Sequence, residues 1–199
     1  MDLDLVWALA GVAVSMTWTP GPNNAMLTAS GVNFGWRRTI PHALGVAFGV
    51  PVMLMVLAFG LGRIFQAEPM IAVVLGWVGF AAVLWFAWRI ANAGAANPER
   101  RSRPLTFFEA IAFQWVNPKA WTFVIWVIAG YVRPEQVATD TAIACVVFLL
   151  SGLGSSQGWT LFGVWIGRWL GTGVRLRVFN IAMALILVGS SAWLMFGGN

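Results

Sequence analysis

The sequence has very few of the side chains that form disulfides or hold metals. Its one cysteine, Cys145, excludes an internal disulfide and a dithiol redox pair. Because His42 is the only histidine, the thiolate and imidazole clusters of common transition-metal sites cannot form either. We therefore expect no metal and no cofactor. Cys145 is expected to be a packing residue, and His42 an interfacial polar residue or a group that titrates near neutrality.

Charged residues are also scarce, at 10% of the 199 residues, whereas hydrophobic residues make up 59%. This composition indicates an all-α integral membrane protein. The net charge of +5 does not indicate nucleic-acid binding, because the arginines form short clusters between apolar stretches. Their expected partner is the anionic cytoplasmic leaflet of the lipid bilayer. The acidic start, residues 1–4, lacks the positive n-region of a cleaved signal peptide, so we expect the first segment to be retained.

Six apolar runs are long enough to cross a bilayer core of roughly 30 Å. They lie at about residues 3–30, 40–62, 69–91, 107–132, 138–166 and 175–196. In this predicted topology nine arginines fall in the loops of one side, and only Arg63 and Arg133 fall on the other. By the positive-inside rule, this bias places both termini in the periplasm of a bacterial inner membrane.

A linker at about residues 92–103 divides the chain into two halves, about 1–91 and 104–199, each with three predicted spans. An odd number of crossings gives the halves opposite orientations, so structural repeats would have to be inverted ones. Neither half alone would shield the polar interruption in its first span from lipid. We therefore treat residues 1–199 as a single transmembrane transporter domain.

The first span of each half, helices 1 and 4 of the six, is interrupted near the predicted membrane midplane by residues that end and start helices. The interruptions contain Thr19, Pro20, Gly21, Pro22, Asn23 and Asn24 in one half, and Asn117, Pro118 and Lys119 in the other. Each predicts a new half-helix whose N-terminus suits a carboxylate. The carbonyls that end the preceding half-helix suit an ammonium. Together they predict a binding site for a zwitterion, with simple kinks as the alternative.

Lys119 is the only lysine in the chain, and it lies within an apolar run. An ammonium at the bilayer centre costs about 2.5 to 3.5 kcal/mol on insertion scales, so it usually faces a partner, a cavity or a transported solute. We predict that Lys119 lies close to Asn23 and binds the substrate carboxylate. The alternative is a structural role, paired with Glu109 or with backbone carbonyls. Glu109 itself is either a proton-coupling group or an acid favoured at a helix start.

Four groups of residues occur in order along the chain: Thr19 to Asn24, Gly31 and Gly35 with Arg37 and Arg38, Gly45-x-x-x-Gly49, and Asn117 to Ala120. Together they resemble the LysE/RhtB family of amino-acid exporters. The resemblance implies a six-helix inner-membrane carrier that expels amino acids using the proton motive force. The run from Gly76 to Ala91 and the absence of an acid after Gly49 are most similar to the cysteine/O-acetylserine exporter branch.

This chain differs from many members of that family at two positions. Many relatives carry Asp where this chain has Val50, and many carry Tyr near the position of Ala82. The loss of a buried acid argues against lysine or arginine as the substrate and favours small neutral amino acids. The alternative function is a membrane-embedded enzyme for a lipid-linked substrate, with Lys119 as phosphate ligand and Glu109 as base. Such enzymes usually need clustered acids or several intramembrane arginines, which the chain lacks, so we expect no enzyme.

Two further patterns concern helix packing and the transport path. The motifs Gly45-x-x-x-Gly49 and Gly163-x-x-x-Gly167 are expected to be close-packing faces, within the monomer or across a homodimer. The fifth predicted span carries a polar cluster that either lines a polar pathway or bonds to neighbouring helices. Its members are Ser151, Ser155, Ser156, Gln157 and Thr160.

Overall fold

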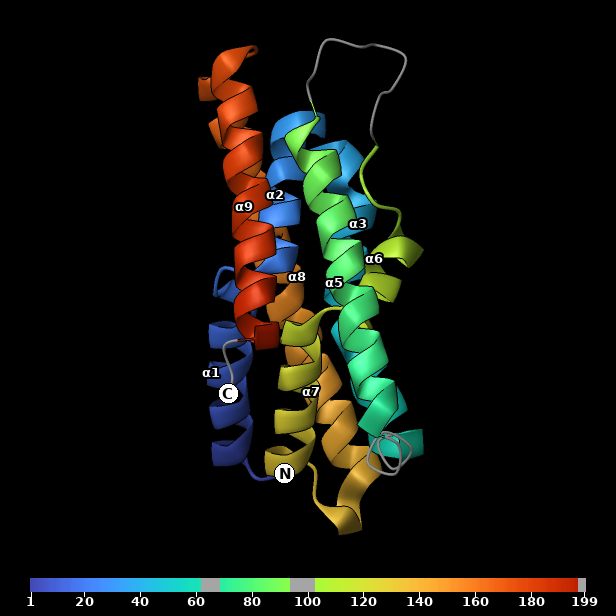
Figure 1. The fold of residues 1–199 in the computed structure, drawn as a ribbon. Helices are drawn as coiled ribbons and strands as arrows, with labels where there is room; N and C mark the ends of the chain where they lie inside the picture. Colours follow the sequence, from blue (N-terminus) through green and yellow to red (C-terminus); the bar gives the residue numbers. More distant parts are fainter. Residues whose placement is uncertain (62–68, 94–102, 197–199) are drawn as a thin grey trace.

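The computed structural model describes residues 1–61, 69–93 and 103–196, and this part of the chain is helical without a strand. In chain order the helices are α1 (Leu3–Trp18), α2 (Pro22–Phe34), α3 (Trp36–Val56), η1 (Leu57–Leu61), α5 (Pro69–Ala91), α6 (Phe107–Gln114), α7 (Pro118–Tyr131), η3 (Pro134–Gln136), α8 (Val137–Leu170) and α9 (Val174–Phe196). The longer helices run up and down along one axis (Figure 1). The all-α prediction is confirmed for the described residues.

Several helices are long and apolar enough to cross a membrane. Three segments meet this criterion of length and apolar composition alone: Trp36–Gly60, Pro134–Leu170 and Val174–Trp193. The helices α1 and α2 meet it together, as a pair that is bent by 54°. α5 contains a shorter apolar stretch, Gly76–Ala91, whereas α6 and α7 have only 8 and 14 residues. The described helices thus supply three or four candidate spans, and the expected count of six stays a prediction.

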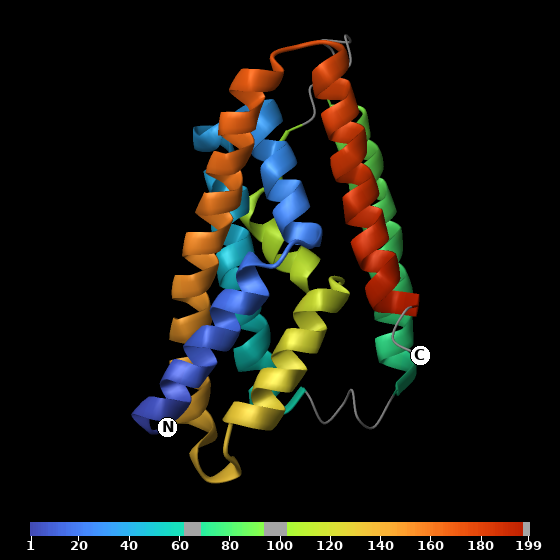
Figure 2. The same cartoon turned by 90° about the vertical axis from the view of Figure 1, so that its left-hand side faces the viewer.

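Both interruptions expected from the sequence are breaks between helices. Gly21 precedes α2 and Pro22 is its first residue. Asn117 precedes α7, and its side chain accepts a hydrogen bond from the backbone N–H of Lys119 at 3.1 Å. A proline at the first helical position loses no helical hydrogen bond, so each break is a favourable place to start a helix. Figure 2 shows both breaks at mid-height of the molecule.

Glycines allow the helices around both breaks to pack closely. A methyl group at Gly163 of α8 would collide with the backbone carbonyl of Thr28 in α2, and one at Gly45 of α3 would collide with the carbonyl of Phe107 in α6. Small residues let helix backbones approach one another in membrane proteins. The expected close-packing faces are therefore confirmed, and these contacts lie within one chain.

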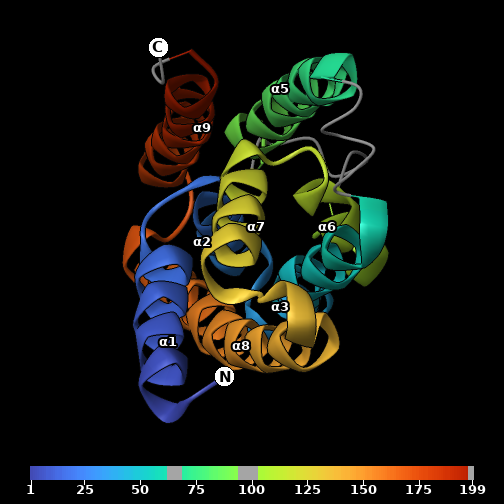
Figure 3. The same ribbon diagram turned by 90° about the horizontal axis from the view of Figure 1, so that it is seen from below.

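Two apolar clusters form the core. One joins α1, α3, α7 and α8 through residues such as Leu9, Val124 and Phe148. The other joins α2, α5, α6 and α9 through residues such as Met26 and Phe113. Figure 3 shows α5 and α9 side by side, and α2 and α7 lie between α9 and α8.

The connections at one end of the molecule carry most of the arginines. The α2–α3 turn, the end of α5 and the α8–α9 turn lie at the top of Figure 1, and the α7–α8 connection lies at the bottom. Among the described arginines, only Arg133 belongs to that lower connection. Arg63 and residues 94–102, which include most of the expected linker, lie outside the described residues.

Candidate functional site

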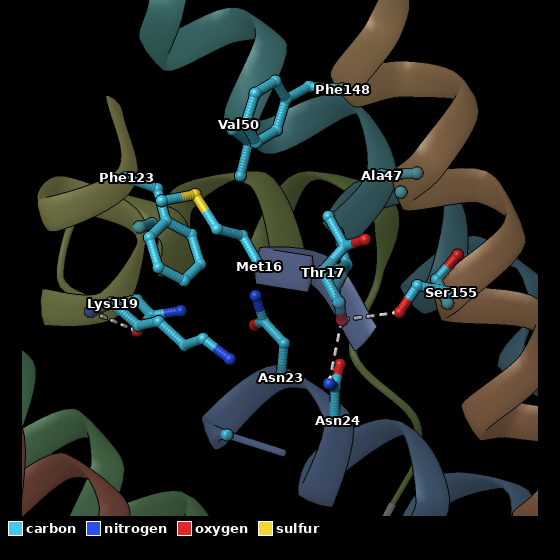
Figure 4. Close-up of a pocket in the computed structure, with 16 residues that line it drawn as sticks. Met16, Thr17, Asn23, Asn24, Ala47, Val50, Lys119, Phe123, Phe148 and Ser155 are labelled. Atoms are coloured by element: carbon cyan, nitrogen blue, oxygen red, sulfur yellow. Dashed lines mark hydrogen bonds between the residues drawn. The ribbon is translucent and has the colours of Figure 1, made fainter. Parts of the chain in front are cut away.

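A cavity of about 560 Å³ lies where the two helix breaks meet α3 and α8. Five of the nine residues expected to bind substrate line it: Gly21, Asn23, Asn24, Asn117 and Lys119. Figure 4 shows the side chain of Lys119 extending toward Asn23 in this cavity. The other four expected residues, Thr19, Pro20, Pro22 and Pro118, are neighbours of the lining residues in the two breaks.

The Lys119 side chain crosses from α7 to the end of α1. Its Nζ donates hydrogen bonds to the carbonyl oxygens of Thr19 at 2.7 Å and Pro20 at 3.4 Å, and it lies 5.3 Å from the centre of the Phe123 ring. No carboxylate forms an ion pair with Lys119 among the described residues. An ammonium has three protons, so two carbonyl contacts leave one donor and the full positive charge for a solute.

The N-terminus of α2 lies directly beside this ammonium. Gly21 offers no side-chain cap, and Pro22 has no N–H. The amides of the first turn, at Asn23 and Asn24, therefore have no helical partner and carry a partial positive charge. A Cβ atom at Gly21 would lie 3.0 Å from Lys119 Nζ. A helix N-terminus and an ammonium thus meet at one point of the wall, an arrangement that suits a carboxylate.

The second break differs from the first in how its helix begins. The Asn117 side chain caps α7 by accepting from the backbone N–H of Lys119. The expectation that both helix starts offer free amides therefore applies best to α2, and the breaks are not equivalent.

The backbone carbonyls at the end of α1 are held by donors of the chain itself. Asn24 Nδ2 donates to the carbonyl oxygens of Thr17 at 3.0 Å and Thr19 at 2.8 Å. Ser155 Oγ donates to Thr17 at 2.7 Å, and Lys119 donates to Thr19. A carbonyl oxygen has two lone pairs, so neither oxygen keeps one free for a substrate ammonium. Asn24 ties the two parts of the broken helix together.

Asn23 is held by Gln114, which was not predicted from the sequence as a site residue. Its Nδ2 donates to Gln114 Oε1 at 2.8 Å, and Gln114 Nε2 donates back to Asn23 Oδ1 at 3.3 Å. Gln114 is fully buried at the end of α6. Its only signal in the sequence is an amide side chain three residues before Asn117, inside an apolar run.

The polar cluster of α8 divides between the two expected roles. Ser155 and Ser156 line the cavity. The remaining members form hydrogen bonds within α8 or to neighbouring helices: Ser151, Gln157 and Thr160. The cluster therefore contributes both to the cavity wall and to helix packing.

Comparison with known proteins identifies the family. The sequence pattern of the LysE type translocators matches residues 14–198. The chain belongs to the LysE family of translocators. It is 33% identical over 176 residues to a cysteine/O-acetylserine efflux protein of Salmonella typhimurium, with 85% of this chain and 87% of that protein covered. A cysteine/O-acetylserine efflux protein of Escherichia coli (strain K12) is 27% identical over 171 residues, with the same coverage. No solved structure matches the chain.

The resemblance to the LysE/RhtB family and its cysteine/O-acetylserine branch is thus confirmed. LysE-type proteins are transporters, so the alternative of a membrane-embedded enzyme is set aside. The cavity lining of this translocator is consistent with Val50 in place of the Asp that many relatives carry. Val50 lines the cavity with Ala47, Phe123 and Phe148, and no acid is among the described lining residues.

Glu109 lies outside the cavity of the translocator, at the start of α6. It forms a capping box with Thr106 and two hydrogen bonds with Arg103, at 2.6 and 2.7 Å. The Glu109 carboxylate raises the pKa of Arg103, so this guanidinium stays charged. This geometry is that of an acid at a helix start, and it excludes an ion pair with Lys119 in this structure. Proton coupling through Glu109 stays a prediction.

Proposed function

We propose that this chain exports small neutral amino acids, with cysteine and O-acetylserine as the first candidates. The observation that carries the proposal is the meeting of the Lys119 ammonium with the uncapped start of α2 inside one cavity. A carboxylate there would accept a charge-assisted hydrogen bond from Lys119 and further bonds from the amides of Asn23 and Asn24. The names of the Salmonella and Escherichia relatives, both cysteine/O-acetylserine efflux proteins, support the choice of candidates.

The rest of the cavity suits the remainder of a small neutral amino acid. Asn23 Oδ1 and the hydroxyl oxygens of Ser155 and Ser156 are polar acceptors for the substrate ammonium. Val50 and Phe148 offer apolar contact to a short side chain. A cationic side chain would find no acid among the described lining residues, and the cost of leaving its charge unpaired would reject it.

We propose further that six spans form two inverted repeats in the bacterial inner membrane, with both termini in the periplasm. The broken pairs α1–α2 and α6–α7 run in opposite directions, which supports inverted halves (Figure 2). Most described arginines lie at one end, which supports the sidedness. A reporter fused after Asn199 should be periplasmic and one inserted near Ala96 cytoplasmic. The reverse result would overturn this orientation.

The export proposal is tested in cells that lack their own exporters. Cells producing the wild-type chain should accumulate external cysteine or O-acetylserine, whereas cells producing Lys119→Met at an equal level should not. Arg38→Gln is the control, because Arg38 is exposed and lies outside the cavity lining. If external cysteine, O-acetylserine, homoserine, threonine and leucine all remain unchanged, the exporter proposal fails for these substrates.

We also propose that the proton motive force drives export, as the family resemblance implies. A protonophore that collapses the proton gradient should stop the accumulation of external amino acid. Efflux that continues after collapse would remove the coupling proposal and leave the substrate proposal intact.

A further inference from the structure

A second cavity, of about 420 Å³, lies at the arginine-rich end of the molecule. It is lined by α2, α3, the end of α5 and the segment before α6, and it shares no lining residue with the first cavity. Much of its wall is apolar, but three basic side chains line it: His42, Arg89 and Arg103.

His42 is a buried polar side chain for which the described part of the chain supplies no hydrogen-bond partner. It is 2% exposed, and neither ring nitrogen forms a hydrogen bond within the described part of the chain. A neutral imidazole has one donor and one acceptor to satisfy. Buried polar groups in native proteins are nearly always paired, so a bare imidazole in a cavity wall points to a bound polar group.

Arg89 adds a positive charge that forms no ion pair with a described carboxylate, and an acid that acts on it electrostatically, Glu109, is already paired with Arg103. Its Nη2 donates to the backbone carbonyl of Arg103 at 2.9 Å, and its guanidinium lies 4.8 Å from the centre of the Trp85 ring. Arg103, in contrast, is paired with Glu109 at 2.6 Å. A guanidinium has five donors in a planar fork that matches a carboxylate, and only one of the five donors of Arg89 forms a hydrogen bond within the described residues.

An apolar layer separates the two cavities. Met26 and Phe113 belong to the apolar cluster of α2, α5, α6 and α9, and Val46 and Phe86 pack against it. Val46 also lines the first cavity, whereas Met26 and Phe86 line the second. A solute that moves between the cavities must therefore displace this layer.

We propose that the second cavity binds the carboxylate of an amino acid before it reaches Lys119. Arg89 supplies the charge, and His42 supplies a further hydrogen bond. This inference rests on the proposed function, and its assignment to the cytoplasmic side rests on the proposed orientation. The cavity is then the site at which the translocator collects its substrate, and the apolar layer holds the path to the first cavity closed in this structure.

The test is equilibrium binding of radiolabelled O-acetylserine to the purified full chain in phosphatidylcholine nanodiscs. Wild type should bind at both cavities. Lys119→Met should keep only the second site, and adding Arg89→Gln should weaken that site by about tenfold or more, because a charge-assisted bidentate contact is lost. Adding His42→Leu to Lys119→Met should weaken it less. The carboxamide of O-acetylserine should not bind at the second site.

Two control variants keep the test interpretable. Arg168→Gln removes an exposed arginine at the same end, in α8 and outside both cavity linings, and it should leave both sites unchanged. Arg89→Lys keeps the charge and should restore part of the binding. A variant is compared with wild type only if it elutes as the same monodisperse peak.

Three results would overturn the inference. Equal binding by Lys119→Met with and without Arg89→Gln would show that Arg89 has no role. If Lys119→Met alone loses all binding, the protein has a single binding site, in the first cavity. Export by wild type would then show that the proposed function still holds without the second site. Displacement of the Arg89-dependent binding by phosphatidylglycerol in the nanodisc would assign the site to a lipid phosphate. Absence of both binding and export by wild type would remove the proposed function itself.

Discussion

Replacing Lys119 by methionine should weaken substrate binding at the first cavity strongly while leaving the fold intact. The substitution removes the only described cation in the first cavity and keeps a long apolar side chain beside Phe123. A hydrogen bond to a charged group contributes about 1.5 to 3 kcal/mol. At about 1.4 kcal/mol for each tenfold change, the dissociation constant should rise roughly 10- to 150-fold.

The hydrogen bonds around Lys119 indicate that this loss is separable from misfolding. Its bond to the Thr19 carbonyl disappears, but Asn24 still donates to the same oxygen at 2.8 Å. Asn117 still caps α7 through the backbone of residue 119, which the substitution does not change. We therefore expect Lys119→Met to insert and purify like wild type.

Two further variants distinguish charge from geometry. Lys119→Arg keeps the charge but should also bind weakly, because a planar fork does not fit the space of a compact ammonium beside Gly21. Gly21→Ala keeps the lysine, but its new methyl would lie 3.0 Å from Nζ and should displace the ammonium from the start of α2. Binding of radiolabelled O-acetylserine measures both. If Lys119→Met binds and exports like wild type, Lys119 is structural, and Ser155 and Ser156 become the next candidates.

Three other changes have expected outcomes. Gly163→Ala should destabilise the protein by about 1 to 3 kcal/mol through overpacking against the Thr28 backbone, whereas Gly189→Ala, which meets nothing within 4 Å, should not lower the melting temperature. Val50→Asp should reduce export of neutral amino acids and allow lysine to compete for binding, because it places a carboxylate in the cavity. Glu109→Gln should leave export proton-driven if Glu109 only starts α6, and uncoupled export would identify it as the proton carrier.

The sequence indicated what kind of surroundings some site residues need, but not which residues supply them. From its place in an apolar run, Lys119 was expected to face a solute, Glu109 or backbone carbonyls. The structure shows the carbonyls of Thr19 and Pro20, while Glu109 pairs with Arg103. His42 was expected at an interface, yet it is buried in the wall of the second cavity. Each outcome depends on which helix face turns toward which neighbour, and composition does not specify this.

The sequence by itself determined the all-helical membrane class, the family and both helix breaks. These properties are local, because apolar length decides whether a segment suits a bilayer, and proline after a capping residue decides where a helix starts. The tertiary structure decided which distant residues meet. Lys119 reaches Thr19 across 100 positions of the chain and Asn23 pairs with Gln114 across 91, because glycine-mediated packing brings separate helices together. The two cavities are the space that this packing leaves between helices, and no local pattern encodes that space.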